Sequence, residues 1–168
     1  MSRELWLLRH AKSDRDLAVD DFDRPLKKRG VHDLARLSGW LLEHHLAPDY
    51  LVCSPANRAL STLKIVQEAL GLASLSIVQD KRIYQESIER IKSVLAECPP
   101  AANVVLLVGH NPELEHLLIN LVGTGNLPDR DKLLPTSALV RLTLPDDWSH
   151  LEAGCATLLS ITYVKELP

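Results

Sequence analysis

Two arginines and two histidines of this chain lie at or just beyond the ends of short apolar runs. Arg9 and His10 follow the first run, Arg58 lies one turn beyond the second, and His110 comes after the run that ends at Val108. The carboxyl ends of parallel strands form one edge of a sheet, and ligands bind beyond that edge. We therefore expect these four side chains to converge on one pocket.

The types of these residues suit the binding and transfer of a phosphoryl group. A guanidinium matches phosphate oxygens bidentately and keeps its charge at any working pH. A neutral imidazole is a good nucleophile toward phosphorus, and a covalent intermediate divides one difficult step into two easier ones. Ser54-Pro55 is typical of a helix start, with a hydroxyl that can cap free N–H groups and a proline at the first helical position. Phosphoryl transfer depends mainly on positioning and charge stabilisation, which this set would supply.

Each of these residues also has a purely structural interpretation. Arg9-His10 could be a polar strand end, Arg58 an exposed helix residue and His110 a turn residue. A protein without a site at this edge has no reason to place four such groups at three strand ends, so the pattern favours the phosphoryl site.

Cys53 offers a rival mechanism, because cysteine-dependent phosphatases also place a cysteine at a strand end and an arginine at the start of the next helix. Their loop is one residue longer than the four that separate Cys53 from Arg58, and no glycine lies between the two here. Pro55 also removes an N–H that a phosphate cradle would use. We therefore interpret Cys53 as a buried strand residue.

The hydrophobic pattern predicts an α/β fold that would position these residues. Short apolar runs predict strands at 5–8, 50–53, 75–78, 104–108, 138–144 and 156–164, and helical spacing predicts helices over 27–45, from 55 to near 71, over 88–98 and around 114–121. Their alternation predicts a three-layer sandwich, with a mainly parallel sheet of about six strands and helices on both faces. The last two strands lack an intervening helix, so we expect one antiparallel edge strand.

Length and composition limit the class of protein. The 168 residues suffice for one core but not for two ordinary domains, so we expect residues 1–168 to form a single domain. A net charge of −3 argues against nucleic acid as a partner. The chain has no signal-peptide pattern and no apolar run long enough to cross a membrane, and its three cysteines do not suggest a disulfide framework. These features indicate a cytoplasmic protein.

Four motifs in order give the chain a resemblance to a known family. Leu8-Arg9-His10-Ala11-Lys12-Ser13 resembles the opening motif of the histidine phosphatase superfamily, and the alanine after the histidine resembles its SixA-type phosphohistidine phosphatase subgroup. Three later motifs fall in the order that this phosphoglycerate mutase-like subgroup shows: Asp23-Arg24-Pro25-Leu26, Ser54-Pro55-Ala56-Asn57-Arg58-Ala59 and Gly109-His110-Asn111-Pro112-Glu113-Leu114. Leu134-Pro135-Thr136-Ser137 resembles its late strand entry.

The resemblance implies a role for each matching residue. His10 would be the nucleophile that becomes phosphohistidine, and Arg9 and Arg58 would bind the phosphoryl oxygens. His110 would add a hydrogen bond to the phosphoryl group during transfer, and Ser13 a further contact. The resemblance also implies histidine-containing phosphotransfer domains of signalling or sugar-uptake relays as substrates.

A proton donor is harder to find in the sequence. Mutase-like members of the superfamily carry an acid in the region that reads Tyr84-Gln85-Glu86-Ser87 here; Glu86 or Glu89 could serve, but a solvated helix face explains both. An alkoxide leaves poorly without a proton, whereas an imidazole can leave already protonated on its other nitrogen. The chain also offers no long insertion for a lid, so we expect a shallow, open site that admits a phosphohistidine displayed on a protein.

The sequence therefore predicts a phosphatase that removes phosphate from phosphohistidine on a phosphotransfer or signalling protein. Two alternatives stay open: a phosphatase for a small phosphomonoester with Glu86 as the acid, and a non-catalytic phosphate-binding domain of the same fold. We expect phosphate or other oxyanions to bind, and no nucleic acid or membrane to be a partner. We expect no metal or organic cofactor, because Glu113-x-x-His116 occurs once and such metal sites use two copies with further carboxylates.

Overall fold

Strand β1 (Arg3–Arg9) separates two hydrophobic cores. The computed structural model describes residues 3–168, and in it Leu5 and Leu7 face one core while Trp6 and Leu8 face the other. Side chains alternate between the two faces of a strand, so an apolar run like this one requires a covering layer on each side.

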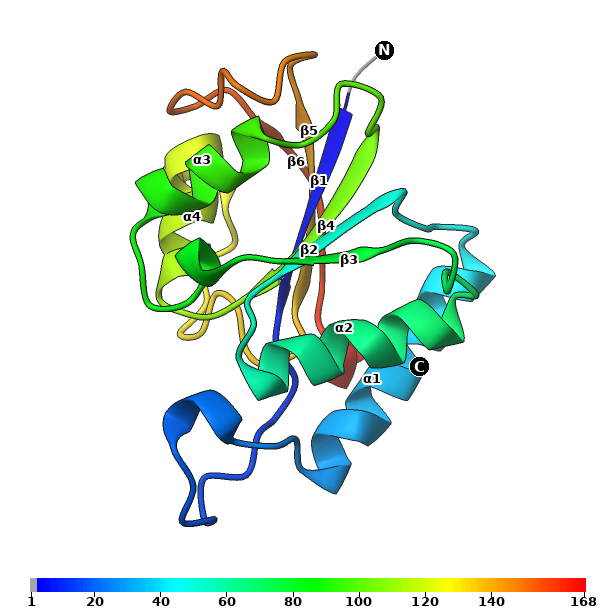
Figure 1. Ribbon diagram of the computed structural model, residues 1–168. Helices are drawn as coiled ribbons and strands as arrows, with labels where there is room; N and C mark the ends of the chain where they lie inside the picture. The colour runs from blue at the N-terminus through cyan, green and yellow to red at the C-terminus, as the bar shows by residue number, and fades with distance from the viewer. Residues whose placement is uncertain (1–2) are drawn as a thin grey trace.

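The sheet has six strands, in the order β3-β2-β4-β1-β5-β6 (Figure 1). The other five strands are β2 (Tyr50–Cys53), β3 (Ile77–Gln79), β4 (Val104–Gly109), β5 (Leu139–Leu144) and β6 (Thr157–Thr162). Strands β1 to β4 pair in parallel, whereas β5 pairs antiparallel with both β1 and β6. The predicted α/β sandwich with a mainly parallel sheet and an antiparallel element on one edge is therefore confirmed.

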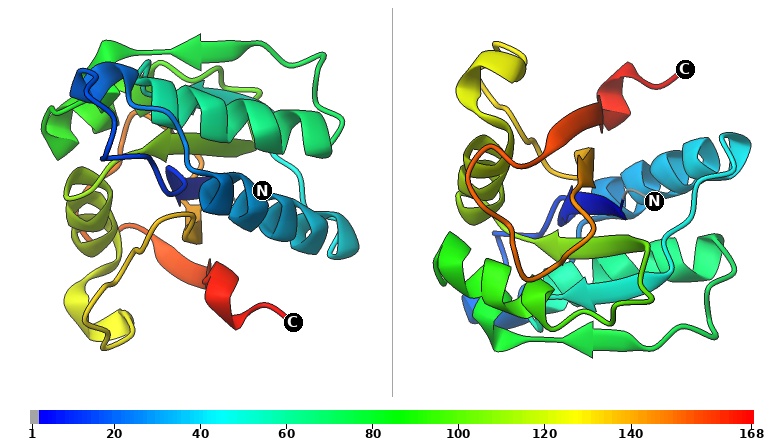
Figure 2. Two further views of the ribbon diagram at one scale, coloured as in Figure 1. Left: turned by 90° about the horizontal axis from the view of Figure 1, so that it is seen from below. Right: turned by 90° about the horizontal axis from the view of Figure 1, so that it is seen from above.

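Two helices cover each face of the sheet (Figure 2). Helices α1 (Lys28–Glu43) and α2 (Asn57–Ala69) pack on the face of Trp6 and Leu8, together with the 3-10 helix η4 (Val164–Glu166). Helices α3 (Ile88–Ala96) and α4 (Glu113–Val122) pack on the opposite face. Three further 3-10 turns are η1 (Asp21–Asp23), η2 (Lys81–Ile83) and η3 (Thr124–Asn126). Within residues 3–168, every helix is too short or too polar to span a lipid bilayer.

The expected start of α2 at Ser54-Pro55 is wrong. The helix begins at Asn57, its N-cap is Ala56, and no side chain caps it. The Ser54 hydroxyl accepts a hydrogen bond from the Ala56 N–H at 3.2 Å, and it also contacts His110. The serine is therefore part of the turn between strand and helix, and its hydroxyl is available to the site.

The parallel register places three strand ends side by side. Arg9 pairs with Gly109, and the N–H of His10 donates to the Gly109 carbonyl at 3.1 Å. On the other side of β4, the N–H of Ser54 donates to the Val108 carbonyl at 3.1 Å. The residues that follow β1, β2 and β4 are thus brought to one edge of the sheet.

Candidate active site

A cavity of ≈ 300 Å³ opens at this carboxyl edge. Arg9, His10, Arg58 and His110 all line it, so the structure brings together the four residues that the sequence analysis selected. The ring centroids of His10 and His110 are 5.3 Å apart. The lining also includes Arg15, Asp21, Arg24, Gln85, Asn111, Pro112 and Glu113.

His10 is held as a neutral imidazole with a defined tautomer. Its Nδ1 lies 2.8 Å from the main-chain carbonyl of Ala11, and a carbonyl only accepts, so Nδ1 carries the proton. The lone pair is therefore on Nε2. Burial lowers the pKa of His10 to about 3, and repulsion from His110, Arg58 and Arg9 adds to this effect. A neutral ring with a free Nε2 is the form that can attack phosphorus.

Main-chain contacts fix the position of His10. The N–H of Ser137 donates to the carbonyls of Arg9 and His10, at 3.1 and 3.3 Å. The N–H of Ala11 donates to the Thr62 hydroxyl at 2.9 Å, and that hydroxyl donates to the Arg58 carbonyl at 2.7 Å. Thr62 thus connects the loop after His10 to the helix that carries Arg58, a role that sequence reasoning missed because a buried helical threonine carries no signal of its own.

Among residues 3–168, only one of the two ring nitrogens of His110 has a hydrogen-bond partner. Its Nε2 lies 2.8 Å from the Ser54 Oγ, whereas its buried Nδ1 has no hydrogen-bond partner among residues 3–168. Ser54 already accepts from the Ala56 N–H, so its own proton can go to Nε2 and leave a donor at Nδ1. Burial lowers the pKa of His110 to about 4, with repulsion from Arg58 as the next cause. At neutral pH the ring can therefore offer a hydrogen bond without a full charge.

The two arginines keep part of their donor capacity unused. Arg9 donates through Nη1 to the Leu134 carbonyl at 3.0 Å, and Arg58 donates through Nη2 to the Asp21 carboxylate at 3.0 Å. The Nε of each guanidinium is buried and without a partner in the part of the chain that the structure describes. Burial also lowers the pKa of Arg9 from its ordinary value.

The loop between β1 and α1 forms one side of the cavity, which differs from the shallow, open site that we expected. This loop supplies Arg15, Asp21 and Arg24, while His10 and His110 are only 5% and 6% exposed. The 18 residues between β1 and α1 therefore form a wall without any long insertion. Sequence analysis treated the segment as an ordinary charged loop and assigned no role to these three residues.

Ser13 and Glu86 occupy positions that differ from the central four residues. The Ser13 hydroxyl is buried and accepts from Arg24 Nε at 2.9 Å, so it orients an arginine of the cavity and is not among the lining residues. Glu86 pairs with Arg90 at 3.4 Å and is also absent from the lining. The segment 84–87 instead presents Gln85, whose amide cannot act as an acid.

Cys53 lies in the core and not in the cavity. It is fully buried, and burial raises the pKa of its thiol to about 12, so at neutral pH it is protonated and a poor nucleophile. Among residues 3–168, no group of three or more histidines, cysteines or carboxylates could hold a metal ion.

The three-layer fold and the pair of neutral histidines at the ends of β1 and β4 suit a phosphatase. A family model described as the histidine phosphatase superfamily (branch 1) matches residues 5–84. Over these residues, just under half of the chain, the sequence is therefore similar to the histidine phosphatase superfamily.

Relatives of known name cover nearly the whole chain. The phosphohistidine phosphatase SixA of Escherichia coli is 26% identical over 144 residues, which are 85% of this chain and 86% of that protein. A Nakamurella multipartitia structure assigned to SixA superposes with a TM-score of 0.83 at 28% identity, over 97% of this chain and 96% of that one. A structure of the protein histidine phosphatase SixA complexed with tungstate gives a TM-score of 0.81 at 23% identity, over 98% and 99% of the two chains.

Proposed function

We propose that this protein is a phosphatase that forms a covalent intermediate on Nε2 of His10 and removes phosphate from phosphohistidine on a phosphotransfer or signalling protein. One observation carries the proposal. Arg9, Arg58 and His110 each have a buried nitrogen without a hydrogen-bond partner, and all three side chains line the cavity that holds His10. Buried donors are normally satisfied, and the oxygens of a phosphoryl group would satisfy these three.

The reaction has two steps. In the first, Nε2 of His10 forms a P–N bond to the phosphoryl group while the P–N bond of the substrate breaks, and the substrate imidazole leaves with a proton on its other nitrogen. In the second, water attacks the phosphorus of phospho-His10, the P–N bond breaks, and inorganic phosphate leaves. Arg9 and Arg58 would bind the equatorial oxygens in both steps, and the Nδ1–H of His110 would donate to one of them.

Neither Asp21 nor Glu86 is placed to protonate an alkoxide leaving group, which supports phosphohistidine as the substrate; Glu113 is the other carboxylate that lines the cavity. The Tyr84 hydroxyl and the Arg58 guanidinium keep the pKa of Asp21 below its usual range, so Asp21 is ionised at neutral pH and holds no proton to give to an alkoxide. Glu86 lies outside the cavity. An imidazole leaving group needs no such acid, and this agrees with the names of the SixA proteins that the chain resembles.

Two further observations bear on the ligand of the cavity and on the cellular compartment of the protein. The tungstate complex of a SixA protein supports an oxyanion as the natural occupant of the cavity. The three cysteines are free of disulfides, which suits a reducing compartment, so we place the reaction in the cytoplasm and treat residues 1–168 as one catalytic unit.

A comparison of two substrates tests the proposal. The protein is incubated with a phosphorylated histidine phosphotransfer domain and with p-nitrophenyl phosphate, and free phosphate is measured for the wild type, His10→Ala, Arg58→Ala and Cys53→Ser. We expect turnover of the phosphodomain, and slower turnover of p-nitrophenyl phosphate, whose phenolate leaves without a proton. Activity should be lost in His10→Ala, reduced by about 10²–10³ in Arg58→Ala and retained in Cys53→Ser. A rapid acid-free quench should trap phosphate on His10, identified by peptide mapping.

Three results would contradict the proposal. Activity in His10→Ala with loss in Cys53→Ser would move the nucleophile to the thiol. Turnover of p-nitrophenyl phosphate alone would indicate a small phosphomonoester as the substrate. Binding of phosphate without turnover of either compound would make the protein a phosphate-binding domain.

A further inference from the structure

A second concave site adjoins the catalytic cavity, and seven of its twelve lining residues are basic. We call this site the basic bay; it has a volume of ≈ 420 Å³. Seven cations line it, contributed by β1 and the loop after it, by α1, by the loop before β5 and by η4: Arg9, Lys12, Arg15, Arg29, Arg130, Lys132 and Lys165. Asp33 is the one carboxylate in the lining, which therefore has a formal excess of six positive charges.

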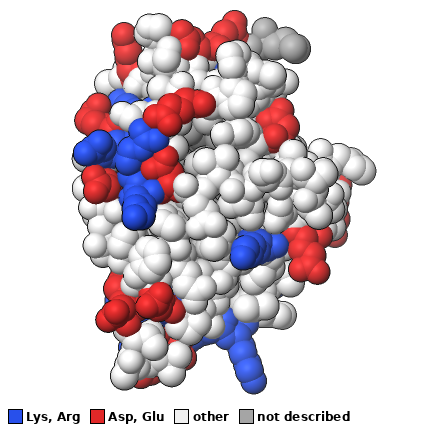
Figure 3. All heavy atoms as spheres, in the orientation of Figure 1, with Lys and Arg blue, Asp and Glu red and all other residues white. Residues whose placement is uncertain are grey.

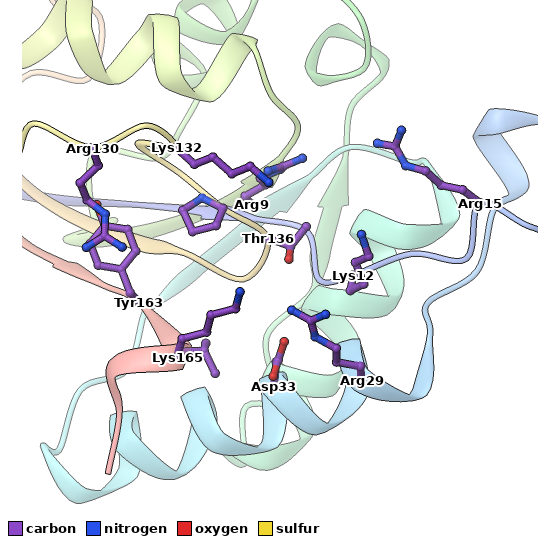
Figure 4. A pocket seen from close by; sticks show the side chains of 12 residues that line it. Arg9, Lys12, Arg15, Arg29, Asp33, Arg130, Lys132, Thr136, Tyr163 and Lys165 are labelled. Atoms are coloured by element: carbon purple, nitrogen blue, oxygen red, sulfur yellow. The ribbon is translucent and has the colours of Figure 1, made fainter.

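The cations of the bay come from distant parts of the sequence but surround one space (Figure 4). Lys12, Arg29 and Lys165 extend into it from below, and Lys132 lies beside Arg9 above it. Arg130 stacks on the ring of Tyr163, with the guanidinium 3.6 Å from the ring centroid. The fold thus collects positive charge that no single stretch of the sequence reveals.

Most of this charge is not neutralised within the protein. Arg130 pairs with Glu166 at 2.7 Å, but Lys12, Arg15, Arg29, Lys132 and Lys165 form no ion pair among residues 3–168. Partial desolvation lowers the pKa of Lys12 from its ordinary value, followed by repulsion from neighbouring cations that include Arg15, Arg29 and Lys132. Such repulsion works against the fold, and an anionic partner would relieve it.

The rest of the protein does not share this excess. The chain has a net charge of −3, so the surface outside the bay is strongly acidic. On the face seen in Figure 3 most of the basic side chains lie against acidic ones. Arg82, for example, pairs with both Asp80 and Glu97. An uncompensated basic site on a protein of net negative charge is a local electrostatic feature, and it would attract an acidic partner to this side of the molecule.

The bay lies next to the catalytic cavity. Arg9 and Arg15 line both. A partner whose phosphorylated side chain enters the cavity therefore places its neighbouring surface over the bay.

The lining suits a protein surface better than a small ligand. Arg15, Arg29, Lys132 and Lys165 are exposed, long and flexible, whereas small-molecule sites are mostly apolar and largely pre-formed. Charges at an exposed rim mainly raise association rates and select the partner.

We propose that the basic bay is the docking site for acidic side chains that flank the phosphohistidine on the protein substrate. This inference rests on the proposed phosphohistidine phosphatase activity. The bay would bring acidic partners to the cavity and discriminate against neutral or basic ones, while the chemical step would depend on the cavity residues.

Two synthetic peptides test this proposal. Both carry one phosphohistidine; one has glutamates on either side of it, and the other has glutamines at the same places. We expect the wild type to favour the acidic peptide by about tenfold or more in kcat/KM at low salt, and the preference to fall at high salt. In Lys12→Gln/Lys132→Gln the ratio should approach one, with p-nitrophenyl phosphate turnover unchanged, because neither lysine lines the catalytic cavity.

A matched variant controls for net charge. Lys64→Gln/Lys81→Gln removes two exposed lysines outside both sites and should keep the wild-type preference. Equal kcat/KM for the two peptides in the wild type would overturn the bay assignment and leave the proposed function standing. Failure to dephosphorylate either peptide would overturn both. If tripolyphosphate binds through Lys12 and Lys132 while the peptides are not discriminated, the bay is a small-anion site and the docking proposal is wrong.

Discussion

The carboxylate of Asp21 occupies the donor face of Arg58. Nη2 of the arginine lies 3.0 Å from Oδ2 of Asp21, and Nη1 donates to the main-chain carbonyl of the same residue at 2.6 Å. The Tyr84 hydroxyl donates to the same carboxylate oxygen at 2.7 Å, and Arg24 donates to the other one at 2.8 Å. The Asp21 carboxylate thus binds two arginines of the cavity, Arg58 and Arg24.

An oxyanion must compete with this carboxylate, so Asp21→Asn should bind oxyanions more tightly. An ion pair with one exposed partner contributes about 0.2–1 kcal/mol, and Asp21 is 42% exposed, so the inhibition constant for tungstate should fall by roughly 1.5- to 5-fold. The constant is measured by competition with p-nitrophenyl phosphate. Asp20→Asn, a neighbouring exposed carboxylate that does not line the cavity, is the matched control and should leave the constant unchanged. Weaker inhibition in Asp21→Asn would mean that the carboxylate supports the anion site.

The hydroxyl of Ser54 should set the tautomer of His110. In Ser54→Ala, Nε2 loses its partner and no longer favours the proton on Nδ1, so the donor toward the phosphoryl group is lost in part of the molecules. We expect kcat to fall by about tenfold, on the order of one lost hydrogen bond, with little change in KM. The ¹⁵N chemical shifts of the His110 ring should report the change in tautomer. Unchanged shifts would show that Ser54 acts only in packing.

The free energy of unfolding should decrease as the pH is lowered, because two histidines are buried in the neutral form. The pKa of His10 is lowered to about 3 and that of His110 to about 4, whereas in the unfolded chain each binds a proton near 6.5. Between these values the unfolded state holds more protons, so their contribution is complete above about pH 6.5 and is lost as pH falls toward 4 and 3. Urea unfolding at pH 7, 6 and 5 should show this decline before most carboxylates titrate. His10→Gln should flatten it, and the same slope in both proteins would contradict the burial argument.

Much of the fold was accessible from the sequence because its elements have strong local patterns. The run Val104-Val105-Leu106-Leu107-Val108 predicts a buried strand, and β4 spans Val104–Gly109. The weak run at 75–78 overlaps β3 at only two residues, since β3 covers Ile77–Gln79. It is a short outer strand with only partly buried side chains, so the hydrophobic pattern there is diluted.

The four central residues of the site were accessible because strand ends in a parallel sheet share an edge. The residues that form the wall of the cavity could not be predicted in this way, because Asp21 and Arg24 lie in an irregular loop that has no hydrophobic periodicity. Two main-chain contacts fix the course of this loop. Ser13 forms an isolated antiparallel bridge with Leu26, and the N–H of Lys27 donates to the Lys12 carbonyl at 2.9 Å. These are main-chain contacts, and they carry no side-chain signal in the sequence.

The conformation of this loop also depends on the first turn of α1, where Gly30 packs against the main chain of Lys12. A Cβ at Gly30 would lie 3.0 Å from the Lys12 nitrogen and closer still to its carbonyl oxygen, which is too near for either atom. Gly30→Ala must therefore displace the segment that follows His10. Overpacking of this kind costs about 1–3 kcal/mol, and we expect a larger effect on kcat than on the fraction folded at 25 °C.

Gly39 of the same helix provides the comparison. A Cβ there meets no atom within 4 Å, so Gly39→Ala should raise the free energy of unfolding by about 0.5–1 kcal/mol through helix propensity alone, with activity unchanged. Urea unfolding and p-nitrophenyl phosphate turnover of both variants separate the two effects. If Gly30→Ala kept wild-type kcat, the close approach of α1 to Lys12 would have no part in positioning His10, and the main-chain contacts of Ser137 and Thr62 would suffice.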